Sequence, residues 1–261
     1  MQIKKHTTAS TLLTDKQTHR KQVWLTAYDT PSATLAELSG VDVILVGDSL
    51  GMVCLGFDST IPVTLEHMIQ HTAAVVRGRD KAWVVCDLPF GSYQQSPEQA
   101  FEAAARVLQQ TGCDAVKIEG GQHMAATIEF LSQRGIAVVA HIGLTPQSVK
   151  KFGGFKKQGK KPEEAETIFQ DAVSVSQAGA VAVVLECIPD DLAVRITTEL
   201  EIPTIGIGAG KACDGQVLVW HDLLGLSEKN PPFAPAYTNL REQITSAIGQ
   251  WSNDVRTGKQ P

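Results

Sequence analysis

Residues 43–49 read Val43-Ile44-Leu45-Val46-Gly47-Asp48-Ser49, a short apolar, mostly β-branched run followed by a turn and an acid. Residues 83–87, 115–119 and 181–186 repeat this arrangement, and each of these runs also ends in a carboxylate. Continuous apolar strands are typical of a parallel sheet that is covered on both faces. A carboxylate is costly to bury without a partner, so the repeated acid predicts that positive charge binds at the strand tips.

Apolar runs alternate with helical spacing from residue 23 onward. Helical periodicity occupies residues 64–77, 97–111, 122–134, 162–177 and 190–200. About eight such units in 261 residues predict an α/β fold, a (β/α)8 TIM barrel that forms a single domain over residues 1–261. An open doubly wound sheet is the alternative, but no G-x-G-x-x-G follows the first strand. The predicted strands are residues 23–27, 43–47, 83–87, 114–119, 136–141, 181–186, 203–208 and 216–220.

The two ends of the chain differ from this pattern. Residues 1–22 form a polar segment, and residues 229–261 combine a proline-rich stretch with a C-terminal helix expected over residues 239–251. The chain contains neither the apolar core of a signal peptide nor a run of roughly 18 apolar residues, so we expect a cytoplasmic protein without a membrane partner.

Composition excludes two further classes of function. The formal charge of −5 and the pI near 5.8, without a basic stripe, argue against a nucleic-acid partner. The five cysteines are widely spaced and form no C-x-x-C pair, which argues against a zinc knuckle and a disulfide framework.

Three carboxylates, Asp48, Asp87 and Glu119, follow three successive predicted strands and should lie close together at the rim of the barrel. Each acid alone could be a helix N-cap or an Asx-turn residue. Together they favour Mg²⁺, because this ion prefers oxygen ligands and leaves positions open for water and substrate. Such an ion suits a 2-oxo acid that chelates through neighbouring oxygens, and it would stabilise the enolate formed by proton removal.

The remaining candidates surround this metal site. Lys117 lies two residues before Glu119 and should share its face of the strand, either to add positive charge at the substrate or as a structural ion pair. Glu186 ends the sixth strand and is the candidate base, unless it is a loop acid paired with a basic residue. His141 ends the fifth strand and could bind the substrate or serve the structure.

Other motifs are weaker. His67 and His71 have the spacing of a zinc pair but lack the H-E-x-x-H pattern, so we do not expect them to be ligands. The glycines of residues 206–210 could hold a phosphate or only make a tight turn. The basic stretch 153–161 is interpreted as a flap or as a solvated loop.

Several motifs in register resemble the ketopantoate hydroxymethyltransferase family from about residue 23 to residue 237. They are LTAYD at 25–29, VGDSLG at 46–51, DLPFGSY at 87–93, VKIEGG at 116–121, HIGLTPQ at 141–147, LECIP at 185–189, GIGAG at 206–210 and DGQVL at 214–218. The chain departs from the family pattern at Pro232, where members tend to carry a basic residue, and at Lys157, where they tend to carry a hydrophobic one.

This resemblance implies a barrel enzyme of pantothenate biosynthesis that uses Mg²⁺. It would transfer a one-carbon unit from 5,10-methylenetetrahydrofolate to 3-methyl-2-oxobutanoate, giving 2-dehydropantoate, and would assemble as a homodecamer of two pentameric rings. An Mg²⁺-dependent lyase or mutase acting on a 2-oxo acid enolate is the alternative, and a non-catalytic metabolite-binding barrel is a more remote one.

The resemblance also implies roles for individual residues. Asp48 and Asp87 would hold the metal and, through it, the substrate, and Glu119 would complete the metal shell directly or through water. Ser49 and Lys117 would contact the substrate, His141 would be a further substrate-binding residue, and Glu186 would accept the proton.

Overall fold

The computed structural model describes residues 6–259, in which eight parallel strands close into a barrel in the order in which they occur along the chain. The predicted (β/α)8 barrel is therefore confirmed. Every predicted strand is present with its boundaries shifted by at most two residues. The strands are β1 (Gln22–Thr26), β2 (Val43–Val46), β3 (Trp83–Asp87), β4 (Ala115–Glu119), β5 (Val138–Gly143), β6 (Ala182–Glu186), β7 (Thr204–Ile207) and β8 (Gly215–Leu218).

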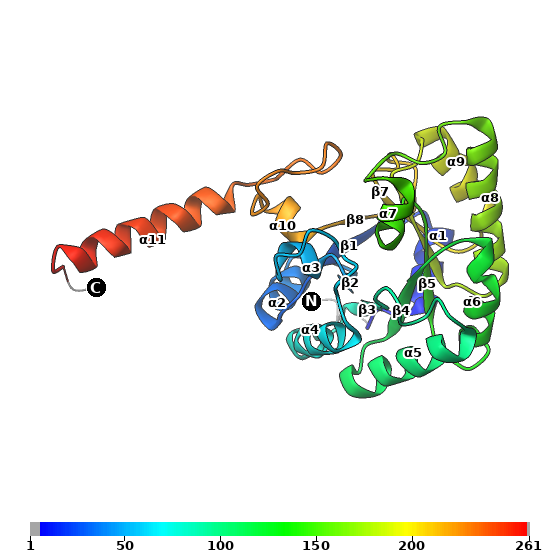
Figure 1. Cartoon of the computed structure of the whole chain (residues 1–261), viewed down its shortest axis with the longest axis horizontal. Helices are drawn as coiled ribbons and strands as arrows, with labels where there is room; N and C mark the ends of the chain where they lie inside the picture. Colours follow the sequence, from blue (N-terminus) through cyan, green and yellow to red (C-terminus); the bar gives the residue numbers. More distant parts are fainter. Residues whose placement is uncertain (1–5, 260–261) are drawn as a thin grey trace. The chain divides into compact units, whose positions relative to one another are not determined.

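Helices follow the strands and surround the barrel (Figure 1). Capping residues fix several helix starts: Asp29, Thr64 and Ser96 each accept a hydrogen bond from a backbone N–H in the first turn. The helices of this layer are α2 (Thr30–Leu38), α4 (Leu65–Gly78), α5 (Pro97–Thr111), α6 (Ala125–Ser132), α8 (Pro162–Gln177) and α9 (Asp190–Glu199). Shorter elements lie in the loops: α3 (Leu50–Val53), η1 (Gln122–Met124), η2 (Pro146–Ser148) and α7 (Val149–Phe152).

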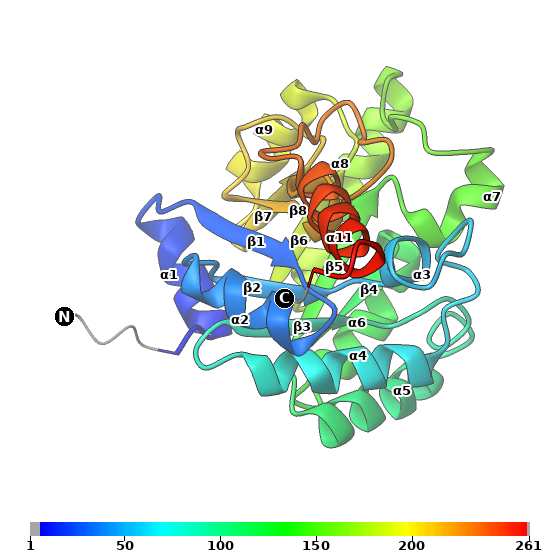
Figure 2. The same ribbon diagram turned by 90° about the vertical axis from the view of Figure 1, so that its left-hand side faces the viewer.

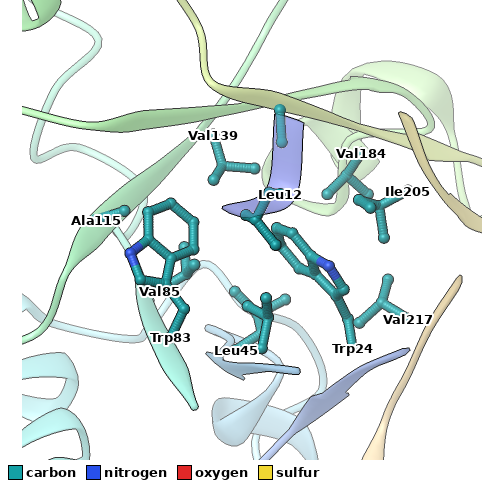
Figure 3. Packing of buried hydrophobic residues seen from close by; sticks show 12 residues of the cluster. Leu12, Trp24, Leu45, Trp83, Val85, Ala115, Val139, Val184, Ile205 and Val217 are labelled. Carbon is teal, nitrogen blue, oxygen red and sulfur yellow. The ribbon is translucent and has the colours of Figure 1, made fainter. Parts of the chain in front are cut away.

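The polar N-terminal segment contains a helix that the sequence analysis did not anticipate, α1 (Ala9–Gln17). Thr8 begins it with a capping box. Its one fully buried apolar side chain, Leu12, lies among core residues such as Trp24 and Val184 inside the barrel (Figure 3). The Leu12 carbonyl accepts a hydrogen bond of 2.8 Å from Gln22 Nε2. Helix α1 therefore supplies part of the barrel core, while residues 1–5 lie outside the described residues.

The register of the strands places the charged residues at one level of the barrel. Asp87 on β3 is opposite Lys117 on β4, Glu119 on β4 is opposite His141 on β5, and Gly143 on β5 is opposite Glu186 on β6. In a parallel barrel the carboxyl ends of the strands face the same way, so these side chains meet at one mouth.

The chain divides into two compact units, Met1–Val217 and Leu218–Pro261. The second unit holds α10 (Trp220–Leu223), a proline-containing turn and α11 (Leu240–Arg256), which includes the expected helix at 239–251. Ile244, Ile248, Trp251 and Val255 are exposed at helical spacing on α11. None of the helices formed by residues 6–259 has both the length and the apolar character needed to cross a membrane. The expectation of one domain over residues 1–261 stays a prediction.

Candidate functional site

The mouth of the barrel brings together six of the seven predicted site residues in one connected set of contacts. Asp48, Asp87, Lys117, Glu119 and His141 are all buried. The side chain of Glu186 retains 14% of its exposure. The seventh residue, Ser49, follows Asp48 directly and donates to, or accepts from, the Tyr28 hydroxyl at 2.9 Å.

The turn after β2 places Asp48 against Asp87. The backbone N–H of Asp48 donates to Asp87 Oδ2 at 3.0 Å. A Cβ atom on Gly47 would lie 2.7 Å from Ser49 Oγ, so a larger residue here would force the Ser49 hydroxyl to move. The glycine in the motif therefore serves close packing in this turn.

Lys117 is the cation of the site. Its Nζ lies 3.0 Å from Asp87 Oδ1 and 3.2 Å from His141 Nδ1. Burial acts to lower the pKa of Lys117, but the nearby charges of Asp87, Glu119 and Asp48 outweigh burial and raise it. Since a lysine ammonium can only donate hydrogen bonds, His141 Nδ1 must accept this one.

His141 lies between Lys117 and Glu186. Burial and the charge of Lys117 hold its pKa well below the usual value, so the imidazole is neutral. With Nδ1 accepting from Lys117, the single ring proton resides on Nε2. That nitrogen lies 3.1 Å from Glu186 Oε2, although the two groups are not aligned as a hydrogen bond. The histidine thus presents an N–H to the predicted base.

Glu186 ends β6 across the barrel from Asp48 and Asp87. Burial raises its pKa to about 7, and the charge of Lys117 acts in the opposite direction. The neighbouring strand comes close here, because a Cβ on Gly143 would lie 2.4 Å from the Glu186 carbonyl oxygen. A carboxylate with a pKa near 7 can accept a proton at neutral pH, which a general base requires.

Two residues that the sequence analysis did not assign to the site, Gln147 and Tyr93, connect its loops. Gln147 Nε2 donates to Asp48 Oδ2 and to the Leu88 carbonyl, each at 2.9 Å, and its backbone N–H donates to Glu119 Oε2 at 2.9 Å. The Tyr93 hydroxyl donates to Gln147 Oε1 at 2.7 Å and accepts from the Glu119 N–H at 2.9 Å. The only sequence signal for either residue is its position inside a loop motif at a strand end.

The site carries an excess of negative charge. Burial, followed by the charge of Asp87, raises the pKa of Asp48 to about 7, and burial together with the charge of Asp48 raises the pKa of Glu119 well above its usual range. In the described part of the chain, Glu119 Oε1 has no hydrogen-bond donor. A cation at this position would relieve the repulsion and favour the ionised carboxylates.

The carboxylates fit an ion that takes few protein ligands. No group of three or more His, Cys, Asp or Glu side chains within residues 6–259 is arranged to hold a metal ion. Mg²⁺ is commonly bound by one or two carboxylates, with water and substrate oxygens in the remaining positions. Asp48 and Asp87, held together by the hydrogen bond between them, match this pattern.

Other candidates have structural roles in the structure. His67 Nδ1 accepts from the Thr64 N–H at 3.2 Å in a helix cap, and His71 Nδ1 lies 2.7 Å from the Tyr28 carbonyl oxygen. In the glycine run, Gly210 has a φ of +77°, and a Cβ there would collide with Asp190. The run therefore makes a tight turn that only glycine accommodates.

The fold and the site define a (β/α)8-barrel enzyme with acid–base groups at the carboxyl ends of its strands. Residues 6–261 match the protein family described as ketopantoate hydroxymethyltransferase. The chain belongs to this family, so the predicted family and the predicted enzyme class, a hydroxymethyltransferase, are confirmed.

Close relatives extend over nearly the whole chain. The chain is 56% identical to 3-methyl-2-oxobutanoate hydroxymethyltransferase from Acaryochloris marina (strain MBIC 11017), with 94% of this chain and 95% of the relative covered. It is 52% identical to the enzyme of that name from Moorella thermoacetica (strain ATCC 39073 / JCM 9320), with 94% and 92% covered.

Similar solved structures share the fold at low sequence identity. Phosphoenolpyruvate phosphomutase from Streptomyces platensis subsp. rosaceus has a TM-score of 0.63 at 15% identity, covering 97% of this chain and 88% of that one. A 2,3-dimethylmalate lyase, described as a member of the PEP mutase/isocitrate lyase superfamily, has a TM-score of 0.61 at 17% identity, covering 96% and 88%. These likenesses concern the barrel alone.

Proposed function

We propose that this chain transfers a hydroxymethyl group from 5,10-methylenetetrahydrofolate to 3-methyl-2-oxobutanoate, forming 2-dehydropantoate. The observation that carries the proposal is the near-neutral base: Glu186 has a pKa of about 7 and lies beside the neutral His141, in a chain of this family. Removal of the proton at C3 of the 2-oxo acid requires such a base.

The proposed metal is Mg²⁺, with Asp48 and Asp87 as ligands and Glu119 completing the metal shell directly or through water. When bound, the ion supplies positive charge that polarises the substrate carbonyl and stabilises the enolate. A phosphonopyruvate hydrolase of similar fold has been solved with oxalate and Mg²⁺, which supports a divalent ion beside neighbouring substrate oxygens (TM-score 0.63, 13% identity, covering 96% of this chain and 87% of that one).

The side chains of the protein perform the proton transfer and the positioning. Glu186 accepts the C3 proton, and His141 Nε2 lies 3.1 Å from its carboxylate. Lys117 places positive charge at the substrate carboxylate or enolate, and Ser49 contributes a hydroxyl contact. His141 is proposed as a further substrate-binding residue. The substrate carbon then bonds to the folate methylene carbon, water supplies the hydroxyl oxygen, and the two bonds from that carbon to the folate nitrogens break, so that tetrahydrofolate leaves with the protons it needs from water and substrate.

The requirement for folate tests this function. The purified protein is supplied with 3-methyl-2-oxobutanoate and Mg²⁺, with and without 5,10-methylenetetrahydrofolate, and products are identified by mass spectrometry. We expect 2-dehydropantoate only when the folate is present. Cleavage or rearrangement of a 2-oxo acid without folate would instead support the lyase or mutase alternative, which the shared barrel fold alone does not favour.

We also propose the homodecamer that the resemblance implies. The exposed apolar residues of α11 support an assembly, because an apolar helix face is costly to leave in water. Sedimentation velocity should give about ten times the mass of the 28.0 kDa chain. The cytoplasmic location stays a prediction.

A further inference from the structure

One segment of the barrel unit is strongly positive, although the protein as a whole carries a negative net charge. Residues 149–161, here named the lysine loop, contain six lysines and no acid, in a chain with a formal charge of −5. All six are exposed, and Phe155 between them retains 54% of its exposure. The six residues are Lys150, Lys151, Lys156, Lys157, Lys160 and Lys161.

The lysine loop is tied to the site at two points. It begins with α7, which follows η2 directly, and η2 carries the Gln147 that binds Asp48. Further along, the Gln158 N–H donates to the Cys187 carbonyl at 2.8 Å, one residue after Glu186. Figure 2 shows α7 projecting from the barrel on the same side as α3, the helix that follows Asp48. The loop thus stands at the mouth beside the base.

Few of these lysines form ion pairs with acidic side chains in the described part of the chain. Lys157 Nζ lies 3.8 Å from Asp190 Oδ1 and Lys161 Nζ lies 3.5 Å from Glu164 Oε1, both in exposed pairs of small energetic value. Within residues 6–259 the other four lysines of the loop form no ion pair. Crowded like charges repel one another, so an anionic ligand would stabilise this arrangement.

The chemistry of the reaction restricts what this ligand can be. The 2-oxo acid carries a single carboxylate, and Lys117 inside the barrel is already available for it. The other ionisable acids of the site, Asp48, Asp87, Glu119 and Glu186, are carboxyl groups and offer no second cation to a polyanion. A ligand with several carboxylates must therefore keep them outside the mouth while its reactive end enters.

We propose that the lysine loop binds the glutamyl carboxylates of the folate cosubstrate, with longer oligo-γ-glutamate tails binding more tightly. The inference rests on the proposed function, which supplies a cosubstrate with an aromatic head and an anionic tail. The loop then holds the tail electrostatically beside Glu186, and it raises the local concentration of the cosubstrate at the mouth.

Steady-state kinetics with two cosubstrates test this proposal. The full-length protein is assayed with methylenetetrahydrofolate carrying one or five glutamates, at low and at high salt. We expect the KM for the five-glutamate form to be about tenfold lower at low salt, and the difference to disappear at high salt. In the double variant Lys156→Gln/Lys160→Gln, most of the difference should be lost, through KM rather than kcat. The matched control Lys229→Gln/Lys259→Gln removes the same charge from exposed positions in the second unit and should retain it.

Equal KM values for the two cosubstrates in the unmodified protein at low salt would overturn the proposal, and so would a double variant that keeps the full difference. Calorimetric binding of the same two folates separates this outcome from failure of the proposed function. If neither folate is turned over, the function fails, and the dependence of affinity on tail length still decides the role of the lysine loop.

Discussion

The pH dependence of proton removal at C3 follows from the environment of Glu186. Its pKa of about 7 means that the carboxyl group is protonated, and inactive as a base, below that pH. Between pH 6 and pH 8 the ionised fraction rises from roughly one tenth to roughly nine tenths, which predicts an increase in rate of about tenfold. The assay follows loss of the C3 proton of 3-methyl-2-oxobutanoate in deuterated buffer by NMR, without folate, so that carbon transfer does not contribute.

Saturating Mg²⁺ allows the titration of Glu186 to be distinguished from that of Asp48, the other group of the site with a pKa of about 7. Asp48 reaches about 7 in the metal-free chain, but a bound cation favours its ionised form and removes it from the measured range. The variant Glu186→Gln should reduce exchange by about 10²- to 10⁴-fold and abolish the pH dependence while substrate still binds. The exposed Glu129→Gln variant should behave like the unmodified protein. A midpoint below pH 5, or exchange that persists in Glu186→Gln, would refute the assignment of the base.

Three further predictions concern the supporting residues. Gln147→Leu should weaken the binding of Mg²⁺ by about tenfold or more in calorimetry, because Asp48 loses its hydrogen-bond donor, whereas Gln94→Leu should not. Leu12→Ala should lower the free energy of unfolding by about 3 kcal/mol in urea titrations, whereas Leu13→Ala on the exposed side of α1 should change it little. In the metal-free protein, Asp48 retains a proton that it loses on unfolding, so its contribution to the free energy of unfolding should fall by about 2 kcal/mol from pH 5 to pH 7. Asp48→Asn should remove this share of the pH dependence and leave the share of Glu186 in place.

The strands and the outer helices could be predicted because each has one dominant environment. Most barrel strands consist largely of apolar residues, and helices such as α5 and α8 show an apolar face with a proline at the start, so their bounds agree with the sequence pattern. Helix α1 has neither signal. A single buried leucine in a polar segment gives no periodicity, because the benefit of burying it comes from a barrel that is formed by residues far along the chain.

The acids of the site could also be predicted, because each ends an apolar strand, but their connections could not. Gln147 reaches Asp48 across 99 positions of sequence, and only the closed barrel brings η2 to the turn after β2. A glutamine in a loop has no periodicity or spacing that would distinguish it from a solvated side chain. Its role becomes visible when both its amide nitrogen and its amide oxygen are seen to have buried partners.

The contacts of His141 show how the two sides of the site are coupled. The sequence left this residue open between a substrate contact and a structural role. Its neighbours define its tautomer, because Lys117 occupies Nδ1 and leaves the proton on the nitrogen that faces Glu186. Asp87 in turn holds Lys117 at 3.0 Å. The series Asp87, Lys117, His141 and Glu186 thus joins the proposed metal ligands to the proposed base, so replacing Lys117 by methionine should disturb metal binding and also raise the pKa of Glu186.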